Sequence, residues 1–395
     1  MRSIGFAARS LVRQPGRTVL GILGIAAVGA LLFDMLLLSR GLVVSFRDLL
    51  DGIGFDVRVT ATDSPLPGGV RLNDSHALAI VVAGLPSVSE AVTMRTAGGV
   101  VVLGAGKERF VTMTGMDPGP RRPWTLVSGR DVALNATPPE VVVNEQLMSD
   151  LAATLGAQVS IRVECDANRA SPVARPFGLV GVAQFPFDSE GQGTAAVSFG
   201  TLRDACGDGD QADMLMVASN GGAAEAVGAI RAARPDVFAV TNEQIVARMQ
   251  AQNFTYFRQI SAVLSTITLV FGFLLITVLL TVSVNQRLGE IAALRALGFS
   301  RARAAADVLA QGAMLITAGG ALALPLGTAL SIWLDRILKS MPGIPAAMHF
   351  FVFEPRALVV HAALLVTTAL LASAYPMWLV ARLPIATTLR NEVVG

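Results

Sequence analysis

The chain has 395 residues, of which 53% are apolar and only 15% are charged, and its net charge is +2. Soluble domains carry about 25% charged residues, so this composition excludes an ordinary soluble protein and indicates a membrane protein. The small net charge argues against nucleic acid as the main partner.

The first predicted membrane span is residues 18–38, an apolar run of about the length needed to cross a bilayer. Residues 1–17 carry four arginines and no acid, which places their side in the cytoplasm. A cleaved signal peptide is the alternative, but its small-residue cleavage site is missing, so we expect an uncleaved anchor within residues 1–45. Asp34 lies inside this span, and an ionisable residue in a membrane is a candidate functional residue. Because Asp34 lies about one turn from the far end of the span, we expect its carboxylate to reach the lipid headgroups instead.

Residues 46–258 have a different composition, in which charges return and short β-rich runs alternate with helical stretches. The pattern predicts an α+β domain, which is extracytoplasmic if the first span begins inside. We expect strands at 55–60, 99–103, 110–115, 140–143, 159–163, 178–182, 195–199 and 214–218, and helices at 74–84, 145–155 and 223–233.

Both cysteines of the chain, Cys165 and Cys206, fall in this domain. A disulfide is plausible in an oxidising compartment. The spacing leaves a bridge and two separate thiols open, and it indicates no metal site. The three histidines, His76, His349 and His361, are scattered, and His361 is expected to be a packed or interfacial side chain.

Gly106-Lys107 superficially matches the end of a phosphate-binding loop. That motif needs a glycine five residues before the Gly-Lys pair and a Ser or Thr after it, but Val101 and Glu108 occupy those positions. A hairpin turn between residues 99–103 and 110–115 is expected instead. The sequence therefore predicts no ATPase motif, no catalytic residue and no cofactor or metal site in this chain.

The remaining segments predict three further spans and their connections. These are span 259–284, cytoplasmic segment 285–303, span 304–334, outer loop 335–356, span 357–380 and cytoplasmic tail 381–395. Gly319, Ala323 and Gly327 recur at four-residue steps, a small-xxx-small row that lets another helix approach closely. A general tolerance of small residues in an alanine-rich chain is the alternative.

Residues 285–303, NQRLGEIAALRALGFSRAR, predict a short charged helix. Leu288, Ile291, Leu294 and Leu297 recur at three-residue steps and make one apolar stripe. Gly298 is suited to ending that helix. The pattern alone fits either a basic loop that fixes topology or a docking helix for a cytoplasmic partner.

This segment resembles the cytoplasmic loop of FtsX/MacB-type (type VII) ABC transporter permeases, where a run R-x-x-E-I-x-x-L-R-A-L-G-x-S follows the second transmembrane helix. The tail is similar to the family's closing A-x-x-x-P-x-x-x-L-R run, with the proline slightly early, and residues 138–163 and 177–207 loosely resemble its outer domain. The matching residues of the loop and tail are Arg287, Glu290, Ile291, Leu294, Arg295, Ala296, Leu297, Gly298, Ser300, Ala381, Pro384, Leu389 and Arg390.

The resemblance implies a membrane protein with four transmembrane helices and a large MacB-like α+β periplasmic domain between the first two. It implies a permease subunit that transmits ATP-driven motion from a separate cytoplasmic ATPase, which would bind the ATP and Mg²⁺. The coupling helix would then contain Arg287, Glu290, Ile291, Leu294, Arg295, Leu297 and Gly298.

The same resemblance implies a location in the bacterial inner membrane, with both termini cytoplasmic. Expected partners are the ATPase, a second permease copy or a similar permease, and membrane lipid, with a membrane-fusion protein or periplasmic carrier as a further candidate. The substrate, whether lipid, lipoprotein, peptide or drug, stays open. The alternatives are an FtsX-like mechanotransmitter that activates a cell-wall hydrolase, and a receptor that needs no ATPase.

Overall fold

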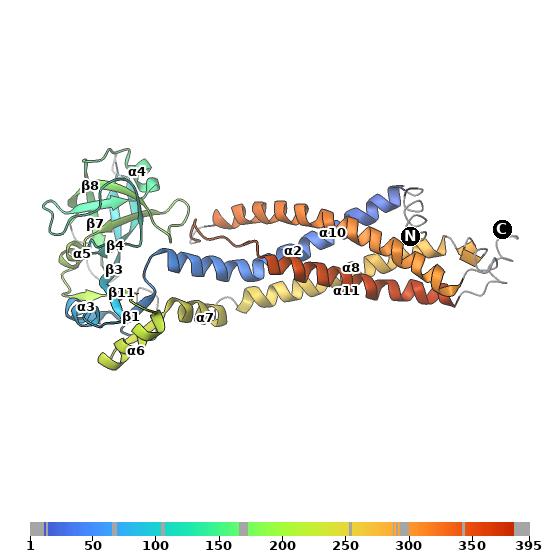
Figure 1. The fold of residues 1–395 in the computed structure, drawn as a ribbon. Coiled ribbons are helices and arrows are strands. Elements are labelled where there is room, and N and C mark those ends of the chain that lie inside the picture. The colour runs from blue at the N-terminus through green and yellow to red at the C-terminus, as the bar shows by residue number, and fades with distance from the viewer. Residues whose placement is uncertain are drawn as a thin grey trace. The chain divides into compact units, whose positions relative to one another are not determined.

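The computed structural model describes residue 12 and residues 15–64, 69–103, 107–165, 173–252, 255–286, 288–289, 291–292, 300–341 and 344–382. The chain divides into two compact units (Figure 1). One is helical and consists of Met1–Leu42, Phe254–Arg336 and Phe350–Gly395. The other is an α+β unit and consists of Val43–Asn253 and Ile337–His349.

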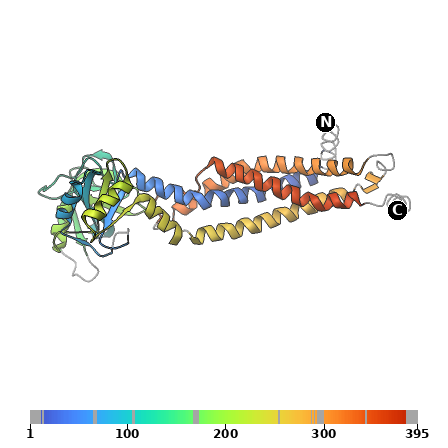
Figure 2. The same cartoon turned by 60° about the horizontal axis from the view of Figure 1, so that its bottom comes forward.

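Four long helices run alongside one another in the helical unit (Figure 2). They are α2 (Pro15–Gly52), α8 (Thr255–Asn285), α10 (Arg301–Lys339) and α11 (Pro355–Ala381). Each contains a stretch long and apolar enough to cross a membrane, and these stretches confirm the four predicted spans.

The first helix is longer than the sequence predicts, because it continues from residue 38 to Gly52. Residues 39–52 contain no proline, and Leu42, Phe46 and Leu50 are buried at four-residue steps. This spacing places their side chains on one helical face, so burial of that face stabilises the extension beyond the apolar span.

The α+β unit contains one sheet of ten strands and a separate pair. The strands are β1 (Val57–Thr60), β2 (Leu72–Asn73), β3 (Val88–Val102), β4 (Glu108–Met116), β5 (Thr125–Gly129), β6 (Glu140–Val143), β7 (Gln158–Glu164), β8 (Arg175–Gln184), β9 (Gly193–Val197), β10 (Gln211–Ala212), β11 (Met214–Ser219) and β12 (Phe238–Thr241). The helices are α3 (Ser75–Ala83), α4 (Glu145–Leu151), α5 (Phe199–Cys206), α6 (Ala223–Ala233) and α7 (Asn242–Gln252).

Six strands of the sheet close a ring. The hydrogen-bonded pairs run β3–β4, β4–β9, β9–β6, β6–β8, β8–β7 and β7–β3. Inward-facing side chains such as Met113, Ile161 and Phe177 fill this small barrel, together with Leu147 of α4 and Leu202 of α5. Closure removes free strand edges within the ring, which stabilises it against edge pairing.

The rest of the sheet carries a second core. β11 pairs with β3 and β1, and β12 pairs with β1. Leu78 of α3 and Ile230 of α6 pack there against Val57, Val59 and Leu215. β3 belongs to both halves, because Val88 lies in this second core and Val101 lies in the barrel.

The predicted strands and helices of this unit are all present; β6 and α6 have the predicted bounds, and the others have shifted ends. The antiparallel β3–β4 pair and a 2.7 Å bond from Leu103 N–H to Lys107 O confirm the predicted pairing of these two strands, while the turn at 104–106 lies outside the described residues. The sequence reading missed β2, β5, β10, β12, α5 and α7. The strand predicted at 195–199 ends earlier than expected. The Ser198 hydroxyl accepts the Thr201 N–H and caps a helix, so α5 begins at Phe199.

Candidate functional site

The predicted coupling helix is described only in part. Leu288 and Gly289, and then Ile291 and Ala292, are helical. The other residues assigned to it lie outside the described residues: Arg287, Glu290, Leu294, Arg295, Leu297 and Gly298.

The small-residue row of α10 packs closely against α2 of the same chain. A Cβ added at Gly319 would lie 2.7 Å from Ile25 Cγ2, and one added at Gly327 would lie 3.0 Å from Phe33 Cδ1. A Cβ at Gly29 would lie 2.8 Å from the Cβ of Ala323. Such distances leave no room for larger side chains, so these residues let the two backbones approach.

Another face of α2 packs against α8. A Cβ at Gly24 would lie 2.9 Å from Leu275, and one at Gly272 would lie 3.0 Å from Val28. α2 is therefore held between two helices through glycines on its own surface and on theirs.

The Asp34 carboxylate does not reach outward to the headgroups as predicted. Its side chain is fully buried, and the Ser331 hydroxyl of α10 donates to its Oδ1. The prediction was wrong because the side chain turns into the bundle, where it bonds a residue of α10 that lies 297 residues away in the sequence. His361, expected to be packed or interfacial, is 3% exposed and lies edge-on to Phe33 with ring centroids 5.4 Å apart.

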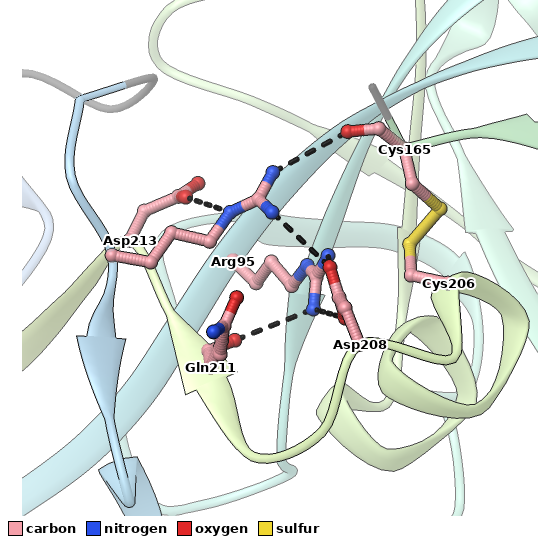
Figure 3. The surroundings of a disulfide bond; sticks show 7 residues. Arg95, Cys165, Cys206, Asp208, Gln211 and Asp213 are labelled. Carbon is pink, nitrogen blue, oxygen red and sulfur yellow. Dashed lines mark hydrogen bonds and ion pairs between the residues drawn. A yellow bond between two sulfur atoms is a disulfide. The ribbon is translucent and has the colours of Figure 1, made fainter. Parts of the chain in front are cut away.

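In the α+β unit, Cys165 and Cys206 form a disulfide (Figure 3). Cys206 is the last residue of α5, and Gly207 follows with a φ of 63°. This left-handed position ends the helix and turns the chain, and glycine adopts it without steric cost. Asp208 comes directly after this turn, so the disulfide and the turn together position its carboxylate.

Asp208 pairs with a buried arginine (Figure 3). Arg95 of β3 is 0% exposed, and its guanidinium donates to both carboxylate oxygens of Asp208, with Nη1 2.6 Å from Oδ1. Arg71 lies 3.1 Å from Asp208 and 3.3 Å from Asp213. The hydrogen bonds and charge of Arg95 hold the pKa of the Asp208 carboxyl below its usual value.

Asp213 extends this charged cluster to the backbone of β3. Its Oδ2 accepts the Thr96 N–H at 2.7 Å and the Thr96 hydroxyl at 2.6 Å. Arg71 also donates to the carbonyl oxygen of Cys165 at 3.3 Å. The cluster thus ties β3, the segment after α5 and the disulfide together, and a paired buried charge of this kind stabilises only while every partner is present.

Asn242 joins the end of α2 to the start of α7. It is 3% exposed, and its Nδ2 donates to the carbonyl oxygens of Phe55 at 2.9 Å and Leu50 at 3.3 Å. It also donates to the Asp51 carboxylate at 3.1 Å. The sequence reading missed this residue, because its partners precede it by almost 200 residues and an asparagine at a helix start is common.

His76 contacts carboxylates on both ring nitrogens. Its Nδ1 lies 3.2 Å from Asp210 and its Nε2 lies 3.5 Å from Asp117. The described residues contain no group of three or more His, Cys, Asp or Glu side chains arranged to hold a metal ion. The contacts of His76 hold α3 against the segments that carry the two carboxylates.

Comparison with known proteins assigns both parts of the chain. A model described as the MacB-like periplasmic core domain matches residues 18–233, more than half of the chain, and one described as FtsX-like permease C-terminal matches residues 262–385. The chain is therefore a permease component of an ABC transporter and a multi-pass membrane protein. It belongs to the FtsX/MacB-type permease family, whose members work with a cytoplasmic ABC ATPase and are not themselves enzymes.

Solved structures give weaker similarities. The periplasmic region of MacB from Actinobacillus actinomycetemcomitans is 15% identical, with a TM-score of 0.36 over 51% of this chain and 95% of that one. The extracellular domain of the noncanonic ABC-type transporter YknZ from Gram-positive bacteria is 13% identical, with a TM-score of 0.35 over 47% of this chain and 98% of that one. A comparison with curated protein sequences found no match.

Proposed function

We propose that this chain is the membrane subunit that carries ATP-driven motion from a separate cytoplasmic ATPase to its α+β domain, for export or extraction of a substrate. ATP and Mg²⁺ bind to the ATPase, and residues 285–303 form the coupling helix that docks on it. In this arrangement both chain termini are cytoplasmic and the α+β domain is extracytoplasmic, in a bacterial inner membrane.

The observation that supports this proposal most directly is the continuity of α2. One unbroken helix runs from Pro15 to Gly52, and it is packed through glycines against α8 and α10. At its other end, Asn242 bonds its last turn to the start of α7. A helix resists axial compression because its hydrogen bonds run along its axis, so displacement of its packed part is passed to its end.

The small-residue row of α10 also limits where a second permease copy can bind. Because α2 of the same chain covers Gly319, Ala323 and Gly327, a partner permease in the complex binds another face of the bundle.

The test is purification of the tagged chain from membranes of its own host. We expect an ABC ATPase subunit to copurify, with ATP hydrolysis in the complex. Arg295→Glu should abolish this ATPase association while leaving membrane insertion intact, because it reverses a charge on the docking surface. Arg336→Glu, the same change near the other end of α10, is the matched control and should retain the ATPase.

Two results would contradict the proposal. If no nucleotide-binding subunit copurifies, the chain acts without an ATPase, as a receptor would. If the complex hydrolyses ATP and changes the activity of a cell-wall hydrolase but moves no substrate, it is a mechanotransmitter and not a transporter.

A further inference from the structure

Three helices bring polar side chains together inside the apolar bundle. Asp34 of α2 has no exposed surface, and Ser331 of α10, 4% exposed, donates its hydroxyl to Asp34 Oδ1. The other carboxylate oxygen, Oδ2, is buried and has no hydrogen-bond partner among the residues that the structure describes. One half of this carboxyl group is therefore unsatisfied.

His361 of α11 is the third of these side chains. Neither of its ring nitrogens has a hydrogen-bond partner in the described part of the chain, and both are buried. Its ring packs on Phe33, the residue next to Asp34, and it lies close to the backbone of Gly29. A second buried titratable group thus packs on the residue that precedes Asp34 in α2.

The group lies toward the end of the bundle at which α10 ends and α11 begins. His361 is six residues after the start of α11 at Pro355, or about 9 Å along its axis. Ser331 is four residues before Asp335, so both share one face of α10. Asp335 Oδ1 accepts the Phe350 N–H at 2.7 Å, at the same end of the bundle. Asp335 and Ser331 therefore lie one helical turn apart on the same face of α10, and Ser331 bonds Asp34.

The surroundings decide the charge of Asp34. Between Gln259 and Asn285, α8 has no acidic, basic or histidine residue that could pair with it. An ionised carboxylate in hydrocarbon with one oxygen unpaired is strongly unfavourable, whereas the neutral acid avoids the cost of burying a charge. Intramembrane acids that remain buried are accordingly candidates for function and not only for packing.

We propose that Asp34 is a proton-binding site inside the bundle, loaded from water at the end marked by Asp335, with His361 as a second buried proton acceptor in the bundle. The proton adds to the carboxylate and no other reactant is required. A metal ion is not the ligand favoured here, because no set of three or more metal-ligating side chains occurs among the described residues. Proton binding at Asp34 does not depend on the ATPase.

The test is infrared spectroscopy of the full chain in lipid nanodiscs at neutral pH. The difference spectrum between the wild type and Asp34→Asn should contain the C=O stretching band of one protonated carboxyl group. Asparagine mimics the neutral acid in size and charge, so this variant should insert and fold. Asp335→Asn is the matched control, and its difference spectrum should lack that band.

Ser331→Ala provides the second measurement. It should retain the band and move it to higher frequency, because the carbonyl oxygen loses the hydroxyl donor. Absence of the band in the wild type would overturn the proposal, since Asp34 would then be ionised. A band that appears only after His361→Leu would also overturn it, because the proton would then reside on His361. A band unchanged by Ser331→Ala would assign it to a different carboxyl group and would equally count against Asp34.

Discussion

The pair of Arg95 and Asp208 shows how much depends on single charged residues in the α+β domain. Arg95 is fully buried, and Asp208, with an 8% exposed side chain, satisfies two of its donors. Removing one partner of such a pair leaves an uncompensated charge in a low dielectric, which costs more than the pair itself contributes.

We therefore expect Asp208→Asn to destabilise the domain by about 3–5 kcal/mol. Thermal unfolding of the detergent-solubilised chain measures this through the fluorescence of buried Trp124, after Trp333 and Trp378 are replaced by phenylalanine. Asp204→Asn, at a 66% exposed carboxylate paired with Arg203, is the control and should change little. Equal effects of the two substitutions would show that the buried pair does not matter.

The same pair predicts a pH dependence with a definite sign. The folded-state pKa of Asp208 is lowered by Arg95, whereas the unfolded chain has the ordinary value of about 3.9. The stabilisation is therefore complete above about pH 4 and is lost as the pH falls through the lower folded pKa. The stability difference between the wild type and Asp208→Asn should shrink in acid, and a constant difference would contradict the assignment.

At the scale of elements, the contact between α2 and α10 is set by residues without side-chain bulk. Gly29→Ala should destabilise the bundle by about 1–3 kcal/mol, since the new methyl group would lie 2.8 Å from the Cβ of Ala323. Gly16→Ala, on the same helix with nothing within 4 Å of the added methyl group, should be neutral or slightly stabilising. Thermal denaturation of the solubilised chain compares the two, and a harmless Gly29→Ala would refute the close approach.

The elements also show what a sequence can and cannot reveal. The four spans and most strands follow from local composition and alternation, so their positions were predictable. The buried polar contacts were not, because their partners are remote: Ser331 lies 297 residues from Asp34, and Asp208 lies 113 residues from Arg95. An arginine inside a β run was the visible sign of the second contact, but no local pattern identifies its partner.

At the scale of the whole molecule, the topology is the property most open to direct measurement. α10 has 39 residues, or about 58 Å of helix, which exceeds the roughly 30 Å hydrocarbon core. We therefore expect residues at its two ends to lie on opposite sides of the membrane. The native cysteines are joined in a disulfide, so a single introduced cysteine can be labelled selectively.

We expect Ser340→Cys to react with a membrane-impermeant maleimide in intact cells and Ser300→Cys to react only after permeabilisation. This outcome follows from the proposed orientation, in which residues 285–303 face the cytoplasm. Labelling of both from the same side would show that α10 does not cross the bilayer, and reversed labelling would place the coupling segment away from any ATPase.

β3 determines the mechanical character of the α+β domain. Its early residues pair with β11 and its late residues pair with β7, while β4 borders it from Met94 to Val102. Bending between the two cores would break consecutive main-chain hydrogen bonds in the middle of this strand, and no loop there can act as a hinge. We therefore expect the domain to resist bending along this direction, so that a force on one core is transmitted through β3 to the other.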